Sequence, residues 1–378
     1  MTLIVTEDGQ PGGIGRYSLD LATALSPAAT LVCLCPDPCG QDCWLGARAA
    51  ARGIELHQVA MPIRGWRRGL IGLLGVWREQ GRPMVHVNGR RGNFIALAAR
   101  VIARRFRFVT TAHGVLGLHD RRNRIYRAVD RVASRAARRV IAVCVDTKRL
   151  LAGAGVPPRQ IAVVLNGLAD HDLRTYAAIA DARSAATQGG DVRLGFLGRL
   201  SREKGTRELA AVARAVLEAD DSAAFVVAGD GPDAPWLTAA TQDLVAGGRL
   251  RLVGPVADPA ELLGAVDILV LPSHNEGLPY VLLEGMAAGC AIVAFRVGGI
   301  PEAVSDASLG ILVPAGDVTS LSRAVVDLAA DPARAHRLGA AAARHVQDQF
   351  RLVDRVPAYE AIYAGATPAP GPDTDVPR

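Results

Sequence analysis

The sequence has few lysines, few aromatic residues and no long apolar stretch. Only Lys148 and Lys204 among its 43 basic residues are lysine, and aromatic residues make up 4% of the chain. So few rings argue against stacking platforms for single-stranded nucleic acid, and no nucleic-acid motif is present, so we expect no nucleic-acid partner. The longest strongly apolar stretches, such as Gly69–Trp77, reach about half the length of a membrane span. Because the N-terminus has no basic segment followed by an apolar one, we expect no signal peptide and a cytoplasmic location.

The cysteines do not follow the paired spacing of a structural zinc site. Four of them, Cys33, Cys35, Cys39 and Cys43, form a C-x-C-x3-C-x3-C cluster. A metal site and a set of buried or loop thiols are both compatible with it, and we favour the thiols because Cys33 and Cys35 fall in a strand-like run. The one D-x-D pair, Asp373 and Asp375, lies in a Pro-rich tail, so no metal is expected.

What the sequence has is enough apolar material for two domains. The chain has 378 residues, half of them hydrophobic. Short apolar runs alternate with helical patterns throughout, which predicts parallel sheets covered by helices on both faces, an α/β class. One such run, Gly53–Leu56, is predicted as a strand. The segment 166–190 is polar, rich in small residues and ends in Gly-Gly, so we interpret it as a break between domains.

The two halves differ in charge. Residues 1–165 contain 25 Lys or Arg and 10 Asp or Glu, whereas the remaining residues contain 18 and 27. Eight arginines gather in the segment 120–139, and more flank Trp66 and Trp77. A basic first half favours an anionic partner, and basic residues beside tryptophans suit a membrane surface. Solvated arginines on an ordinary amphipathic helix are the competing interpretation.

Several segments suggest binding of a phosphate-bearing ligand. Gly12, Gly13 and Gly15 follow the first strand and precede a helix, where backbone can approach an anion. Arg199 and Lys204 lie in a strand-to-helix loop and could clamp a diphosphate, whereas a solvated charged loop is the competing interpretation of this segment alone. Glu276 precedes a helix whose first amides are positively polarised, and Glu284 lies within that helix.

Read together, the segments GGIGRY, TAHG, VLNGL, GRLSREKG, VVAGDGP and EGLPYVLLEGMAAG resemble family 4 glycosyltransferases of the GT-B fold. The resemblance covers nearly all of residues 1–363, and the E-x7-E element together with GRLSREKG is highly specific. It implies two Rossmann-like domains facing each other across a cleft, an N-terminal acceptor domain (1–165) and a C-terminal donor domain (166–350). It also implies a helix at 351–363 that crosses back to the first domain, before a disordered tail at 364–378.

The resemblance implies a retaining transferase that uses a nucleotide-sugar without metal or other cofactor. Arg199 and Lys204 would bind the donor diphosphate, Glu276 the sugar hydroxyls and Glu284 the ribose. The remaining residues carried over are His113, near the reacting sugar, and Gly13, Gly198, Gly277 and Leu278 on the donor. Two departures stand out: the hinge reads Leu165-Asn166-Gly167-Leu168, and Pro279 has no N–H to offer a phosphate.

The resemblance implies transfer of a hexose or N-acetylhexosamine from a nucleotide-sugar, which we expect to be UDP-linked, in bacterial surface polysaccharide assembly. The acceptor would be a glycan or a lipid-linked sugar, approached by Arg121, Arg122 and Arg124, with peripheral contact at the inner face of the plasma membrane. Alternatives are a transferase acting on a soluble sugar or natural product, a GT-B epimerase, and a non-catalytic protein that binds nucleotides or glycans.

Overall fold

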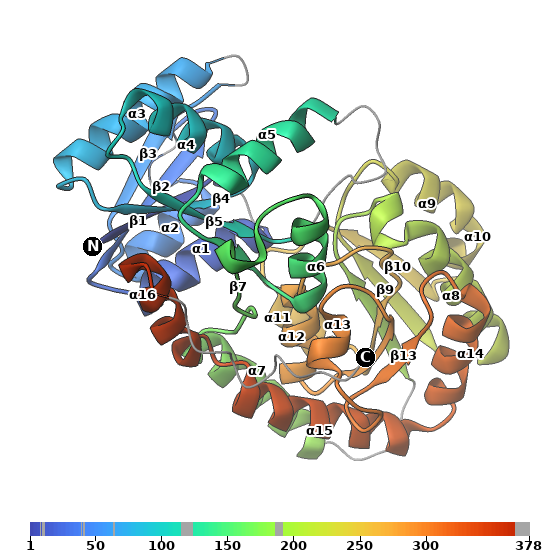
Figure 1. Cartoon of the computed structure of the whole chain (residues 1–378). Helices are drawn as coiled ribbons and strands as arrows, with labels where there is room; N and C mark the ends of the chain where they lie inside the picture. The colour runs from blue at the N-terminus through green and yellow to red at the C-terminus, as the bar shows by residue number, and fades with distance from the viewer. Residues whose placement is uncertain are drawn as a thin grey trace. The chain divides into compact units, whose positions relative to one another are not determined.

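The computed structural model describes residues 1–7, 9, 12–38, 40, 42–62, 65–114, 124–185 and 192–366, apart from the side chains of 124–127. The chain divides into two compact units. Unit 1 contains Met1–Asn166 and the C-terminal segment that begins at Leu352, and unit 2 contains Gly167–Arg351. Each unit is built around its own parallel sheet (Figure 1).

Unit 1 has a seven-stranded parallel sheet in the order β3-β2-β1-β4-β5-β6-β7. Its strands are β1 (Thr2–Thr6), β2 (Ala29–Cys35), β3 (Leu56–Ala60), β4 (Met84–Asn88), β5 (Phe108–Ala112), β6 (Val140–Ala142) and β7 (Ile161–Val163). Every residue of β1 and β2 is buried. Helices covering both faces explain why these strands are apolar throughout and do not alternate.

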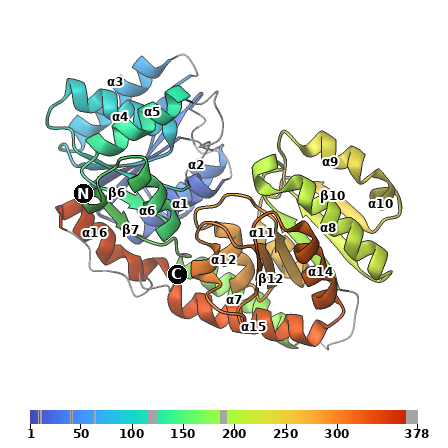
Figure 2. The same ribbon diagram turned by 45° about the vertical axis from the view of Figure 1, so that its right-hand side comes forward.

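The helices of unit 1 pack on the two faces of this sheet (Figure 2). They are α1 (Gly13–Ala24), α2 (Trp44–Ala51), α3 (Trp66–Glu79), α4 (Arg90–Ile102), α5 (Arg124–Ala136), α6 (Val145–Gly153) and α16 (Val356–Ala364), with short 3₁₀ turns at Pro158–Gln160 and Leu352–Arg355. One face carries α3, α4 and α5, and apolar side chains of α3 and α4 form a core with the strands. The other face carries α1 and α16, where Tyr17 and Tyr359 are fully buried.

Unit 2 has a six-stranded parallel sheet in the order β10-β9-β8-β11-β12-β13. Its strands are β8 (Arg193–Leu197), β9 (Ala224–Ala228), β10 (Leu250–Gly254), β11 (Ile268–Leu271), β12 (Ala291–Phe295) and β13 (Ile311–Val313). Its helices are α7 (Asp170–Ala185), α8 (Thr206–Ala219), α9 (Ala234–Ala240), α10 (Gln242–Ala246), α11 (Pro259–Ala265), α12 (Tyr280–Ala287), α13 (Ile300–Ala303), α14 (Val318–Ala329) and α15 (Pro332–Gln349), with a 3₁₀ turn at Arg202–Lys204. A core cluster of this unit is drawn from residues between Val192 and Leu338.

The α/β class and the parallel sheets agree with the sequence prediction, but one predicted strand is wrong and one helix was not predicted. The strand predicted at Gly53–Leu56 lies at Leu56–Ala60. This is an edge strand with only Val59 buried, so its apolar pattern is weak. The segment 166–190, interpreted as a break between domains, does begin where the two units divide. It nevertheless contains a sixteen-residue helix, α7, whose apolar pattern is weak because only Leu173 and Tyr176 of it are buried.

The three described cysteines of the cluster, Cys33, Cys35 and Cys43, are buried thiols, as the thiol interpretation expects, and Cys39 lies outside the described residues. The tail predicted to be disordered lies outside them from residue 367 onward. Among the described helices, none is both long enough and apolar enough to cross a bilayer.

Candidate active site

The two sheets share a feature that places ligands in open α/β folds. In unit 2 the strand order reverses between β8 and β11, and in unit 1 it reverses between β1 and β4. Ligands of such sheets bind beyond the carboxyl ends of the strands, at the point of reversal. In unit 2 this point lies among the loops after β8, β9, β11 and β12. Three of the segments singled out in the sequence, GRLSREKG, VVAGDGP and EGLPYVLLEGMAAG, contain residues of the loops after β8, β9 and β11.

A lysine and a glutamate from two of these loops form an ion pair. Lys204 Nζ lies 2.7 Å from both Oε1 and Oε2 of Glu276. Lys204 ends the 3₁₀ turn after β8, and Glu276 lies between β11 and α12. The Glu276 side chain is 7% exposed and that of Lys204 is 29% exposed. The carboxylate is therefore held by one ammonium group that still reaches solvent and has a further N–H to offer a ligand.

Glycines fix the loops against one another at separations that no side chain tolerates. Gly205 has φ +74°, and a Cβ there would lie 1.9 Å from the carbonyl oxygen of Pro272. Gly298 has φ +54°, and its Cβ would lie 1.9 Å from the carbonyl oxygen of Glu276. The next amide, that of Gly299, donates to the carbonyl of Gly277 at 2.6 Å. The loops after β8, β11 and β12 thus form one rigid frame around Glu276.

The other predicted donor residues lie on the same loops. Arg199 is exposed, and no hydrogen bond or ion pair within the described part of the chain involves its guanidinium. Gly198 continues from β8 and donates its N–H to the carbonyl of Ala228 at 3.1 Å. Gly277 and Leu278 are buried just before α12. Glu284 lies in the second turn of that helix and is 3% exposed, so its position is fixed by packing.

Unit 1 presents a second set of polar groups at the carboxyl end of its sheet. His113 directly follows β5, and its Nε2 lies 3.1 Å from Oδ1 of Asn88, the last residue of β4. The Tyr17 ring meets the His113 ring edge-on, with centroids 4.6 Å apart. Burial lowers the pKa of His113 to about 4, so the imidazole is neutral at pH 7. With Nε2 donating to Asn88, Nδ1 is the hydrogen-bond acceptor of this ring.

Two residues near this edge were missed by the sequence analysis. Glu7, directly after β1, accepts hydrogen bonds from the backbone N–H groups of Arg91 and Gly92 in the first turn of α4. Burial raises the pKa of this carboxyl group. Asn88 also donates to the Ser18 hydroxyl at 3.1 Å. Neither residue stands in a distinctive motif, and only their place after a strand at the reversal point could have signalled them. Gly13, which was predicted, is exposed at the first position of α1.

The predicted acceptor residues are only partly described. Arg121 and Arg122 lie outside the described residues, and Arg124 begins α5 with a side chain that is also outside them. His274, between β11 and α12, has its Nε2 2.9 Å from Oε1 of Glu208 on α8.

Comparisons with known proteins agree with this geometry. The family model described as Glycosyltransferase Family 4 matches residues 11–171, and the one described as Glycosyl transferases group 1 matches residues 191–331. The 2-deoxystreptamine N-acetyl-D-glucosaminyltransferase of Streptomyces fradiae is 30% identical over 77% of this chain and 76% of its own. The 2-deoxystreptamine glucosyltransferase of Streptomyces kanamyceticus is 32% identical over 54% of this chain and 55% of its own.

Solved structures show the same fold at lower sequence identity. The Anabaena protein HepE, crystallised in complex with UDP-glucose, matches with a TM-score of 0.81 and 19% identity over 96% of this chain and 99% of its own. A sucrose-phosphate synthase from Thermosynechococcus elongatus matches with a TM-score of 0.79 and 21% identity, over 96% and 98% of the two chains. The chain therefore belongs to the family 4 glycosyltransferases of the GT-B fold.

Proposed function

We propose that this glycosyltransferase moves glucose or N-acetylglucosamine from a UDP-sugar, with retention of configuration, to a hydroxyl of a small polyhydroxylated acceptor. The observation that supports a nucleotide-sugar donor best is the Lys204–Glu276 pair, 2.7 Å between charged atoms, in a glycine-locked frame beside the exposed Arg199. Two relatives that bear N-acetylglucosaminyl- and glucosyltransferase names take 2-deoxystreptamine, a soluble aminocyclitol.

In this proposal, cleavage of the bond between the sugar C1 and the diphosphate leaves negative charge on the leaving UDP. Arg199 and Lys204 stabilise that charge, with the amides of Gly277 and Leu278. Glu276 accepts hydrogen bonds from sugar hydroxyls, Glu284 from the ribose, and Gly198 and Gly13 allow close approach of the backbone. His113 offers a neutral imidazole to the sugar. The new bond from C1 to the acceptor oxygen forms as the acceptor hydroxyl loses its proton to the leaving phosphate.

The donor and the stereochemistry are tested by one assay. Purified protein is incubated with UDP-glucose, UDP-N-acetylglucosamine or GDP-mannose, with and without 2-deoxystreptamine or D-inositol 3-phosphate. We expect nucleotide release that depends on both a UDP-sugar and an acceptor, and an α-linked product by the anomeric proton coupling. Release of UDP at the same rate without any acceptor would instead indicate an epimerase or hydrolase, and binding without turnover a non-catalytic protein.

We also propose that no metal takes part, because two cations of the chain neutralise the diphosphate. Turnover is expected to stay within about twofold when EDTA is added to the assay. A loss of activity that Mg²⁺ or Mn²⁺ restores would contradict this.

A second candidate is a lipid-linked acceptor at the inner face of the plasma membrane, as expected in surface polysaccharide assembly. The excess of 15 positive charges in residues 1–165 supports it. Activity on such an acceptor in acidic vesicles should fall steeply with salt. It should weaken when Arg121, Arg122 and Arg124 are all changed to Gln. Salt-independent activity on soluble cyclitols alone would exclude this candidate.

A further inference from the structure

A pocket in unit 1 lies at the amino ends of the strands, whereas His113 and Asn88 lie at their carboxyl ends. Its volume is about 570 Å³, and it is lined by Arg82, Pro83, Met84, Arg100, Arg104, Arg105, Arg107 and Tyr363. Met84 begins β4, and Arg107 directly precedes β5, so the pocket borders the amino ends of these strands. The volume is that of a site for a small-molecule ligand.

The charge of this pocket is of one sign. Five of its eight lining residues are arginines, and within the described part of the chain no Asp or Glu lines it. Nor do these five arginines take part in any ion pair between described residues. All five are exposed. Arg100 donates one hydrogen bond to the carbonyl of Arg104, and the Arg82 guanidinium lies over the Trp77 ring, 5.9 Å from its centroid. Because each guanidinium carries five N–H donors, these contacts leave donors for a ligand. Like charges gathered around one concavity repel one another, and an anion bound there would relieve that repulsion.

The arginines converge from three separate segments, which distinguishes the pocket from one solvated helix face. Arg100 lies on α4, while Arg104, Arg105 and Arg107 lie on the connection from α4 to β5. Arg82 lies on the turn before β4 and has φ +62°, the one positive φ of a non-glycine residue in the described ranges. This costly conformation turns the chain so that Arg82 joins the others. Arg100 also donates to the carbonyl of Arg104, which ties the end of α4 to the connection.

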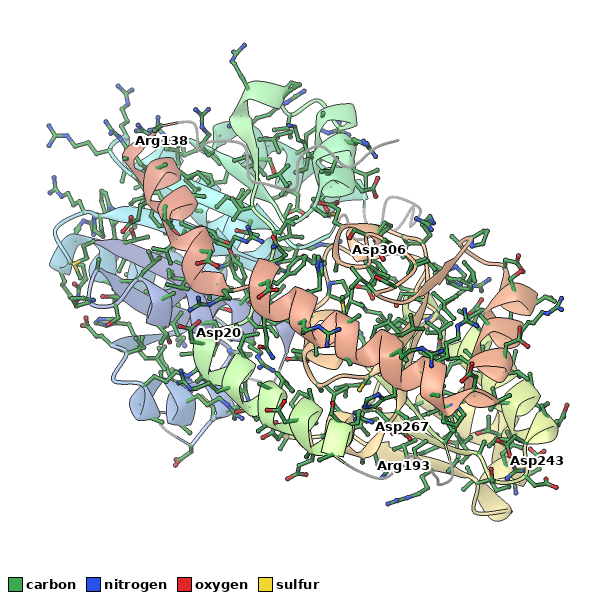
Figure 3. All side chains as sticks on the ribbon, turned by 90° about the horizontal axis from the view of Figure 1, so that it is seen from below. Asp20, Arg138, Arg193, Asp243, Asp267 and Asp306 are labelled. Carbon is green, nitrogen blue, oxygen red and sulfur yellow. The ribbon has the colours of Figure 1, made fainter. Side chains whose placement is uncertain are left out.

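Tyr363, which also lines the pocket, is held in place from inside the unit. The Tyr363 hydroxyl lies 2.8 Å from Nδ1 of the fully buried His86. One residue further along α16, the Ala364 carbonyl accepts a hydrogen bond of 3.2 Å from Arg138 Nη2. Figure 3 shows Arg138 at this end of α16. Five guanidinium groups beside a fixed Tyr363 favour binding of an oxyanion.

We propose that this pocket is a binding site for a phosphate-bearing ligand, separate from the donor site. The phosphate comes either from a soluble compound or from the headgroup of an acidic phospholipid. Val101 and Ile102, which follow Arg100 on α4, are 75% and 63% exposed. Two exposed apolar side chains beside basic residues suit insertion at a lipid surface. Replacing them should therefore affect binding to a phospholipid but not to a soluble phosphate compound.

The experiment measures binding of inorganic pyrophosphate to the full-length protein by calorimetry, with the donor site saturated by UDP. The test variant is Arg100→Gln/Arg104→Gln/Arg107→Gln. The matched control, Arg334→Gln/Arg337→Gln/Arg344→Gln, removes three exposed arginines of α15 in unit 2. We expect the test variant to weaken pyrophosphate binding at least tenfold, and the control to change it less than twofold. All three proteins should have the same thermal unfolding midpoint within about 2 °C.

Lys204→Ala alters the proposed donor site but not the pocket, so pyrophosphate binding at the pocket should be unchanged in this variant. This expectation holds whether or not the protein uses a UDP-sugar, so it separates failure of the pocket proposal from failure of the proposed function. Equal pyrophosphate affinity in wild type and test variant, or equal loss in test variant and control, would overturn the proposal.

Vesicles identify the source of the phosphate. If it is a lipid headgroup, the protein binds phosphatidylglycerol vesicles but not phosphatidylcholine vesicles, and Val101→Ser/Ile102→Ser weakens vesicle binding while leaving pyrophosphate binding unchanged. If the source is soluble, pyrophosphate binds and vesicles do not.

Discussion

At the scale of single residues, the Lys204–Glu276 pair couples stability to function. Removal of Lys204 leaves a carboxylate that is 7% exposed without its counter-ion, so the fold as well as the transition state loses a favourable interaction. We expect Lys204→Ala to lower kcat/KM by roughly 10²–10³. Because the ammonium is partly exposed, the free energy of unfolding should fall by only about 1–2 kcal/mol.

The double variant Lys204→Ala/Glu276→Gln separates the two effects. Since glutamine carries no charge, the double variant should recover most of the free energy of unfolding that Lys204→Ala loses, as measured by urea unfolding. Its activity should stay low. Recovery of activity together with stability would mean that the pair serves folding alone.

His86 makes the stability of unit 1 depend on pH. It is fully buried between Tyr363 and the Thr111 hydroxyl, which lies 2.6 Å from Nε2. Burial and the nearby His113 lower the pKa of His86 to about 3. Below an unfolded-state pKa of about 6.5, the unfolded chain binds a proton that the folded chain excludes. The folded state is therefore most favoured above pH 6.5 and loses stability as the pH falls from there toward about 3.

This loss amounts to about 1.4 kcal/mol per pH unit, or roughly 2 kcal/mol between pH 6.5 and 5. Urea unfolding of wild type and His86→Gln at these two pH values checks it. The variant will be less stable at neutral pH because it breaks two buried hydrogen bonds. Between pH 6.5 and 5, the free energy of unfolding of the variant should nevertheless fall by about 2 kcal/mol less than that of wild type. The same pH dependence in both proteins would contradict a lowered pKa of His86.

At the scale of elements, the glycines between strands set the active-site frame. Gly298→Ala would place a Cβ 1.9 Å from the Glu276 carbonyl oxygen, whereas Gly316, with φ +80°, has no atom within 4 Å of the same position. Both substitutions impose the cost of a left-handed backbone, about 1–2 kcal/mol. Only Gly298→Ala should also displace the loop that carries Glu276. We expect it to reduce kcat/KM at least tenfold in the donor assay, and Gly316→Ala to leave kcat/KM within twofold.

The sequence predicted those elements whose residues are uniformly buried. The runs Ile268–Leu271 and Ala291–Phe295 predict strands because each is continuously apolar and is followed by Pro272 or Arg296, and β11 and β12 lie at these residues. β13, with three residues at the sheet edge, was missed, as was α7 with two buried side chains. Positions in a short edge strand or a sparsely buried helix have little apolar pattern, so tertiary packing decides their structure.

The same limit applies to the candidate site. The spacing of charged residues in loops after strands pointed to Arg199, Lys204 and Glu276, because parallel strands bring these loops to one edge. The spacing gave no sign that Lys204 and Glu276 bind each other, since 72 residues separate them. Glu7, Asn88 and the arginine pocket arise from segments that only the sheet order brings together.

At the scale of the whole molecule, the two units differ in chain continuity. Unit 2 is formed by one continuous segment, whereas unit 1 combines two segments that are far apart in the sequence. The described core cluster of unit 2 lies between Val192 and Leu338, inside the segment 167–351. Unit 1 instead needs the C-terminal helix α16. Tyr359 is fully buried there, with its hydroxyl 3.0 Å from that of Tyr17, and Tyr363 contacts His86.

This asymmetry predicts how fragments behave. The fragment 167–351 should fold alone, with a cooperative thermal transition. The fragment 1–166 should not, because the face that α16 covers would expose Tyr17 and leave the His86 and Thr111 groups open to water. Loss of such a buried aromatic contact costs roughly 3–5 kcal/mol, a large part of the stability of a domain this size. Adding a peptide of residues 352–366 to fragment 1–166 should restore a cooperative transition by circular dichroism, and the same peptide with Tyr359→Ala should not. Cooperative unfolding of fragment 1–166 without the peptide would show that α16 is dispensable for the core.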